Sequence, residues 1–235
     1  MARITRKELK TDKFALEVEH TFSFFEEHQQ EIARYGGIAL VVVVLAAGFY
    51  VYRQHQHTAR EAALAHALQI QDTPVGTPPA GSTTITMFPT EQVKDDAALK
   101  VFSDLRSKYS GSDEAEIAGY YLGGIQAGQG KLADAEKTFR EVAEKGNEQY
   151  ASLAKLSLAE VYFAQGKVDQ GRKIFEDLIA HPTVFVSKDQ AQIGLARALL
   201  PVRPEEARKI LEPLKNTSGA AAQIALQLYS DLPPQ

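Results

Sequence analysis

Two stretches of nearly identical sequence, GQGKLADAEKTF (Gly128 to Phe139) and AQGKVDQGRKIF (Ala164 to Phe175), decide the fold class. Corresponding residues such as Phe139 and Phe175 lie 36 positions apart. An internal repeat with a period of roughly 20–50 residues is typical of proteins that stack one supersecondary unit many times. The sequence therefore predicts a repeat architecture.

The residue types in both copies follow the tetratricopeptide pattern, a pair of helices about 34 residues long. Small residues let the two helices of a pair approach closely, and aromatic residues fill the space between consecutive pairs. We predict an all-α solenoid of such hairpins over residues 91–235, closed by a capping helix over residues 219–232. The predicted packing residues are Leu122, Gly123, Ala135 and Phe139, then Leu158, Ala159, Tyr162, Gly171 and Phe175, then Ala207 and Leu211 in a weaker third copy, with Ala98 and Phe102 marking a partial copy before them.

The turn inside each hairpin has its own pattern. Gly130 and Gly166 are predicted to end the first helices, because the left-handed conformation that caps a helix costs glycine nothing. Asp134 and Asp169 follow near the start of the second helices, where the helix dipole favours an anion. The period exceeds the standard by two residues, and we expect the extra residues in the loop at 146–149.

A very different stretch, GGIALVVVVLAAGFYVY from Gly36 to Tyr52, has no charged residue and is apolar on every face of a helix. At roughly 1.5 Å per residue it spans about 25 Å, slightly less than a bilayer core of about 30 Å. We predict a transmembrane helix that acts as an uncleaved signal anchor. A buried core helix and a signal peptide cleaved near residues 63–65 are the alternatives.

Basic residues are more numerous before this segment than after it, which predicts a cytoplasmic tail over residues 1–35 and an exported C-terminal part. They are Arg3, Arg6, Lys7, Lys10, Lys13 and Arg34 before it, against Arg53 and Arg60 after it. The tail also carries one apolar helical stripe, formed by Phe14, Val18, Phe22, Phe25 and Ile32. That stripe fits a protein contact or a homo-oligomer through residues 10–35, and it fits equally a helix that merely continues the membrane span.

Residues 53–71 are predicted to form a helix that leads into the solenoid. Residues 72–90 are rich in Pro, Gly and Thr and are predicted to form a long loop, either mobile or functional.

Composition and motifs argue against catalysis, nucleic-acid binding and metal binding. The net charge is −4 and Cys is absent, so a nucleic-acid footprint and thiolate sites are not expected. Gly130-Lys131 lacks the other residues of a phosphate loop, and Ser152 to Lys155 spells SxxK inside a repeat helix. His55 and His57, with His66, form at best a weak metal site. We predict no enzyme, no cofactor and no metal.

What remains is a binding surface. The first helices of stacked pairs line a concave side that binds peptides. The repeat register places these residues in that groove: Tyr120, Gly124, Ala127, Leu156, Glu160 and Phe163. Tyr120 and Phe163 are the expected anchors, and for Phe163 packing against the neighbouring repeat is the alternative.

The layout of tail, span, Ala-rich helix, loop and degenerate repeats resembles the YfgM-like family. The residues that carry the resemblance are the span from Gly36 to Tyr52, AREAALAHA from Ala59 to Ala67, and YYLGGIQAGQGKLADAE from Tyr120 to Glu136. That family consists of ancillary subunits of the SecYEG translocon in the bacterial inner membrane. The resemblance implies a periplasmic repeat domain whose partners are translocon subunits, secretory chains or periplasmic chaperones. A structural subunit of another envelope assembly is the alternative function.

Overall fold

The computed structural model describes residues 29–77 and 87–233, and within these ranges the regular structure is helical, without strands. The predicted all-α fold class is thereby confirmed. The chain divides into two compact units between Thr58 and Ala59. The apolar stripe from Phe14 to Phe25, on which the predicted contact through residues 10–35 rests, lies outside the described residues, as do residues 78–86 of the predicted loop.

Helix α2 (Gln29–Asp72) contains the uncharged segment of the sequence. The part of it from Ala33 to Asp72 is long and apolar enough to cross a membrane, and its most apolar stretch is not buried. Side chains such as Leu40, Val43 and Leu45 are all more than half exposed. A helical stretch that is apolar all round and not buried matches the composition of a membrane span.

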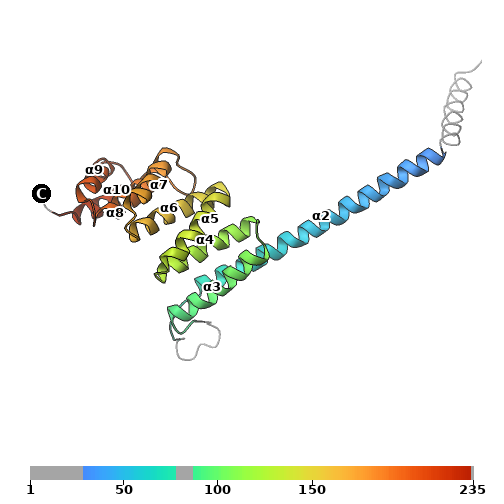
Figure 1. The fold of residues 1–235 in the computed structure, drawn as a ribbon, viewed down its shortest axis with the longest axis horizontal. Coiled ribbons are helices and arrows are strands. Elements are labelled where there is room, and N and C mark those ends of the chain that lie inside the picture. Colours follow the sequence, from blue (N-terminus) through green and yellow to red (C-terminus); the bar gives the residue numbers. More distant parts are fainter. Residues whose placement is uncertain (1–28, 78–86, 234–235) are drawn as a thin grey trace, which may run out of the picture. The chain divides into compact units, whose positions relative to one another are not determined.

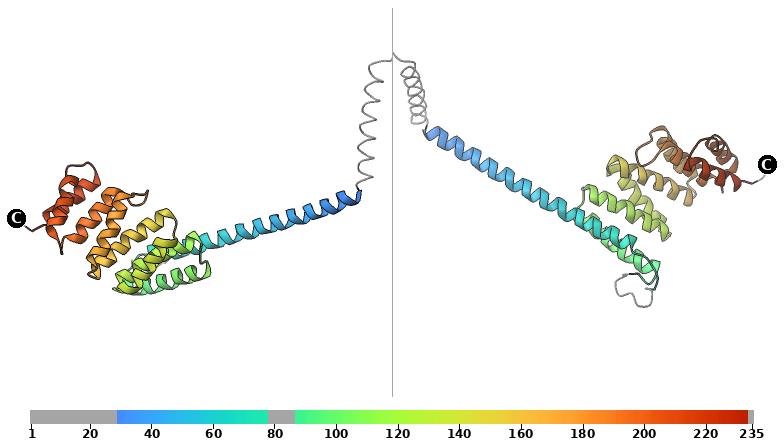
Figure 2. Two further views of the ribbon diagram at one scale, coloured as in Figure 1. Left: turned by 45° about the horizontal axis from the view of Figure 1, so that its top comes forward. Right: turned by 180° about the vertical axis from the view of Figure 1, so that it is seen from behind.

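The second unit is a row of helix hairpins (Figure 1). Its helices after α2 are α3 (Glu91–Lys108), α4 (Asp113–Gly128), α5 (Leu132–Lys145), α6 (Glu148–Ala164), α7 (Val168–Ala180), α8 (Lys188–Leu199), α9 (Pro204–Leu214) and α10 (Ala220–Ser230). Each helix packs against the next, and α4 also contacts α6, as α6 contacts α8. The first helices of successive hairpins therefore lie side by side (Figure 2).

The hairpin turns are built in the same way in the two clear repeats. Gly130 and Gly166 have φ angles of +73° and +75°, so both adopt the predicted left-handed conformation. The amide of Gly130 donates a hydrogen bond to Ala127 O, and the amide of Lys131 donates one to Gln126 O. The amides of Gly166 and Lys167 form the corresponding two hydrogen bonds in the next hairpin. This is the Schellman arrangement, which satisfies the carbonyls left open at a helix end. The GK dipeptide is thus part of a helix cap.

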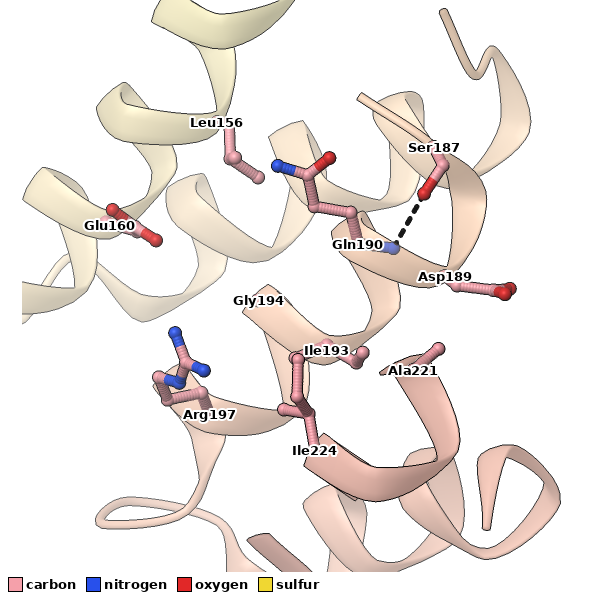
Figure 3. Close-up of a pocket in the computed structure, with 10 residues that line it drawn as sticks. All are labelled: Leu156, Glu160, Ser187, Asp189, Gln190, Ile193, Gly194, Arg197, Ala221 and Ile224. Carbon is pink, nitrogen blue, oxygen red and sulfur yellow. Dashed lines mark hydrogen bonds between the residues drawn. The ribbon is translucent and has the colours of Figure 1, made fainter. Parts of the chain in front are cut away.

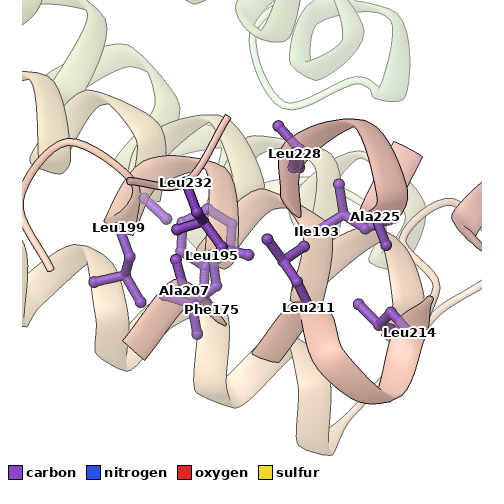
Figure 4. Close-up of a cluster of buried hydrophobic side chains, with 12 residues drawn as sticks. Phe175, Ile193, Leu195, Leu199, Ala207, Leu211, Leu214, Ala225, Leu228 and Leu232 are labelled. Atoms are coloured by element: carbon purple, nitrogen blue, oxygen red, sulfur yellow. The ribbon is translucent and has the colours of Figure 1, made fainter. Parts of the chain in front are cut away.

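One large aromatic side chain fills the interior of each of the first three hairpins. Phe102, Phe139 and Phe175 are all fully buried, in α3, α5 and α7. Around Phe175, helices α8, α9 and α10 close the C-terminal end of the core with leucines such as Leu199 and Leu211 (Figure 4). Helix α10 packs on both α8 and α9 and covers the last hairpin.

The N-terminal hairpin of this unit joins the end of α2 to α3. Ala67 is fully buried in one cluster with Ala98 and Phe102. The base of the connecting loop is closed by two backbone hydrogen bonds, since the amide of Gly76 donates to Phe88 O (2.9 Å) and the amide of Phe88 donates to Pro74 O (3.0 Å).

One expectation about the turns was wrong. Only Gly146 and Asn147 separate α5 from α6, so the loop at 146–149 holds no extra residues. The Asn147 side chain accepts a hydrogen bond from the Tyr150 amide (3.1 Å) and starts α6 at once. The long period arises instead within the helices, because α6 runs for 17 residues.

Candidate peptide-binding groove

Two hollows lie along the row of first helices. The larger one, of about 430 Å³, lies where α6, α8 and α10 meet. Its apolar wall is formed by Leu156 of α6, Ile193 of α8 and Ile224 of α10 (Figure 3). The smaller one, of about 330 Å³, lies between α4 and α6 and includes Gly124, Ala127 and the edge of Phe139. Both have the size and partly apolar lining of ligand-binding hollows in proteins.

Glu160 lines both hollows and so joins them into one groove across α4, α6 and α8. Although its side chain reaches solvent, loss of hydration between these helices raises the pKa of Glu160, and nearby Arg197 opposes that rise by its positive charge. A carboxylate that is costly to ionise is a common feature of binding and catalytic sites. The groove therefore contains a charge that the fold itself disfavours.

Arg197 belongs to the last turn of α8 and also lines the larger hollow. Figure 3 shows the Arg197 guanidinium on the same side of the hollow as Glu160. Among the described residues, no ion pair or hydrogen bond joins the side chains of Glu160 and Arg197 to each other or to a third group. The hollow thus offers one acidic and one basic side chain beside an apolar surface.

Four of the residues predicted to face the groove line these hollows. Leu156 and Glu160 line the larger one, and Gly124, Ala127 and again Glu160 line the smaller one. Gly124 is exposed, and a Cβ added there would meet no atom within 4 Å. At Gly124 the backbone of α4 itself therefore lines the groove and is accessible to a ligand.

The two aromatic residues proposed as anchors lie elsewhere. Phe163 packs on the ring of Phe175 (centroids 6.1 Å apart) and on Gly171, where an added Cβ would lie 2.5 Å from Phe163 Cδ2. Tyr120 makes ring contacts with Tyr121, Phe139 and Tyr150 at 5.6–6.1 Å. Both rings are half-buried and neither lines one of the two hollows, so their role as anchors stays a prediction.

The residues predicted to pack within the repeats are all buried in the structure. They are Leu122, Gly123, Ala135, Phe139, Leu158, Ala159, Tyr162, Gly171, Phe175, Ala207 and Leu211.

Sequence reasoning missed the part of the groove contributed by α8 and α10. Gln190, Ile193, Arg197 and Ile224 line the larger hollow, and none of them was predicted to do so. The third repeat is the weakest in sequence, and its pattern alone does not indicate which of its residues face the groove. Arg197 follows Leu195 and Ala196 as Glu160 follows Leu158 and Ala159, and this correspondence is the signal that could have placed Arg197 in the groove.

The motifs set aside in the sequence have structural roles. The Ser152 hydroxyl donates to Gln149 O (2.7 Å) and accepts from the Thr183 hydroxyl (2.8 Å), which ties α6 to the loop before α8. Lys155 pairs with Asp177 at 3.0 Å. Within the part of the chain that the structure describes, no three His, Cys, Asp or Glu side chains are grouped as metal ligands would be.

Stacked helix hairpins with a groove along their first helices define a repeat-type protein–protein interaction module. The comparison with family models gives the class a name. A family described as a tetratricopeptide repeat-like domain matches residues 23–190, which is well over half of the chain. The chain belongs to that family. No curated protein and no solved structure matches it.

Proposed function

We propose that this protein is a membrane-tethered interaction module that binds peptide segments of partner proteins in the groove of α4, α6 and α8. The observation that carries the proposal is the presence, in one chain, of a tetratricopeptide-like groove and an apolar helix without protein packed on its most apolar stretch. A membrane tether raises the effective concentration of the groove for partners at the same bilayer. Binding, and not catalysis, is the proposed activity.

We further propose the bacterial inner membrane as its location, with residues 1–35 in the cytoplasm and the repeats in the periplasm. The larger number of basic residues before the span supports this orientation. The resemblance to the YfgM-like family supports an ancillary role at the Sec translocon. Its partners would then be translocon subunits, emerging secretory chains or periplasmic chaperones.

Site-specific photo-crosslinking of the full-length protein in its native membrane tests this proposal. Gly124 and Gln190 are suitable positions for the photoreactive residue, because Gly124 has open space above it and Gln190 is an exposed residue of the larger hollow. Lys137 on α5 is the matched control, since it is exposed on a second helix and lines neither hollow.

We expect adducts to translocon subunits, exported chains or periplasmic chaperones from the two groove positions and not from Lys137. Adducts to cytoplasmic proteins would contradict the orientation. Equal labelling from all three positions would contradict the groove. Adducts only between copies of the chain would favour the alternative function, a structural subunit that oligomerises.

A further inference from the structure

Several ion pairs join different helices of the repeat row. Arg106 of α3 pairs with Glu141 of α5 at 2.8 Å, and Lys155 of α6 pairs with Asp177 of α7 at 3.0 Å. Arg172 of α7 contacts Glu206 of α9 in the same way. Each of these charged side chains is neutralised by a partner from another helix.

The two charged side chains that face each other across α6 and α8 in the larger hollow form no such pair. Glu160 and Arg197 lie on adjacent first helices and influence each other electrostatically, yet among the described residues neither forms an ion pair. Glu160 also loses hydration there, which raises its pKa. Opposite charges held near each other without direct contact leave both sites open to a ligand with complementary charges.

The wall beside them sets a further requirement. Leu156, Ile193 and Ile224 form an apolar surface next to the two charges (Figure 3). An apolar side chain of a ligand would lose its contact with water on that surface, whereas a purely charged segment would leave the surface uncovered. The hollow therefore matches a segment that carries both kinds of side chain.

We propose that this hollow selects peptide segments in which an apolar residue is flanked by one basic and one acidic residue. The basic side chain pairs with Glu160, the acidic side chain pairs with Arg197, and the apolar side chain covers Leu156, Ile193 and Ile224. This inference rests on the proposed function, and it adds the charge pattern of the bound segment. The partner is a protein segment of that composition.

The test uses the full-length protein in lipid nanodiscs and a library of short random peptides displayed on phage. Selected peptides are counted for residue types and then synthesised, and their affinities are measured by fluorescence anisotropy. Gln190→Trp fills the larger hollow and identifies the peptides that bind there, because Gln190 is an exposed residue of its lining. Only peptides that Gln190→Trp weakens are used further.

We expect these peptides to be enriched in an apolar residue flanked by opposite charges. Glu160→Gln and Arg197→Gln should each weaken binding about tenfold, which corresponds to one partly desolvated charge pair. The double exchange Glu160→Arg with Arg197→Glu keeps both charges in the hollow but reverses their order. The double variant should bind the original peptides as weakly as the single variants do. From the library it should select peptides in which the two charges are exchanged.

Two results would overturn the inference. If the double exchange restores wild-type affinity for the original peptides, Glu160 and Arg197 serve each other and not the ligand. If the hollow selects peptides without any charge preference, the apolar wall alone determines binding. In both cases peptides still bind in the groove, so the proposed function stands. If no selected peptide is weakened by Gln190→Trp and none by Gly124→Trp in the smaller hollow, the proposed peptide-binding function itself fails.

Discussion

Gly123 on α4 lies directly against the ring of Phe139 on α5: a Cβ added to Gly123 would be 2.8 Å from Phe139 Cε1 and 2.9 Å from Cδ1. A similar close approach occurs between two hairpins, where a Cβ on Gly194 of α8 would be 2.7 Å from Phe175 Cε1 on α7. These separations are shorter than carbon–carbon contact, so no side chain fits without movement. The helices approach as closely as they do because glycine is at both positions.

Gly123→Ala is therefore expected to destabilise the repeat domain. The added methyl group must displace a fully buried ring, and overpacking of this kind costs about 1–3 kcal/mol. The free energy of unfolding, measured by urea titration in detergent with circular dichroism, should fall by that amount.

Gly124→Ala is the matched control, one residue further along the same helix. No atom lies within 4 Å of the added Cβ, and alanine favours a helix over glycine by about 0.8–1 kcal/mol. This variant should be more stable than the wild type. If both variants change stability in the same direction, the contact with Phe139 does not explain the small residue at position 123.

The caps at Gly130 and Gly166 give a second prediction. A Cβ at either position meets nothing within 4 Å, so the cost of alanine there comes from its left-handed backbone alone. That cost is about 1–2 kcal/mol per residue. We expect each single substitution to lower the free energy of unfolding by about that much.

Gly128→Ala is the control for the caps, because Gly128 is the last residue of α4, has open space around it and has no positive φ angle. It should leave stability unchanged or increase it slightly. A loss of stability at Gly128 equal to that at Gly130 would show that the left-handed conformation is not what requires glycine.

The sequence predicted the hairpins well because their signals are local. Gly130, Gly166 and the buried Phe139 and Phe175 stand at fixed positions within each repeat, and one turn geometry serves both copies. The period did not reveal where its extra residues lie, since a longer helix and a longer loop add the same number of positions. Only the cap at Asn147 shows that α6 begins at once after α5.

The groove was predicted only in part, for a physical reason. Repeat register indicates which helix face is concave, and it placed Leu156 and Glu160 there. It does not indicate whether a side chain on that face turns inward: Phe163 lies against Gly171, because the missing side chain at 171 leaves room for its ring. Ile224 comes from the capping helix, which has no register to follow.

The raised pKa of Glu160 gives a third prediction. Because its pKa is higher in the folded than in the unfolded chain, the folded state binds the proton more tightly. The free energy of unfolding therefore falls as pH rises from the pKa of the unfolded chain, about 4.3, through the pKa of the folded chain. At neutral pH Glu160 is ionised and this loss of stability is complete. Glu160→Gln should be more stable than the wild type at pH 7, and the difference should vanish near pH 4. Urea titrations at both pH values measure this, and a difference that grows at low pH would contradict it.

Glu136 is predicted to behave in the opposite way. A hydrogen bond from Lys167 (2.8 Å) chiefly lowers the pKa of Glu136, and Arg140 adds a further favourable charge. An acid with a lowered folded pKa stabilises the fold above its unfolded pKa, and that contribution is lost as pH falls through the folded value. Glu136→Gln should lower stability by about 0.5–1 kcal/mol at pH 7, as expected for an ion pair at the protein surface. The loss should shrink on acidification in the same titrations; a loss that is independent of pH would assign the effect to packing.

The last prediction concerns a truncated chain without Met1 to Tyr52. The part of α2 that packs in the repeat unit begins after that point, since Ala67 is fully buried with Phe102 and Arg60 lies 3.4 Å from Glu114 of α4. The apolar segment contributes no buried side chain, so its removal should not cost the repeat domain any core. We expect a soluble, cooperatively unfolding helical protein, checked by gel filtration and circular dichroism. A further truncation that also removes residues 53–72 should expose Phe102 and Ala98 and lower stability. An aggregated product from the first truncation, or equal stability of the two, would contradict the assignment of the end of α2 to the first hairpin.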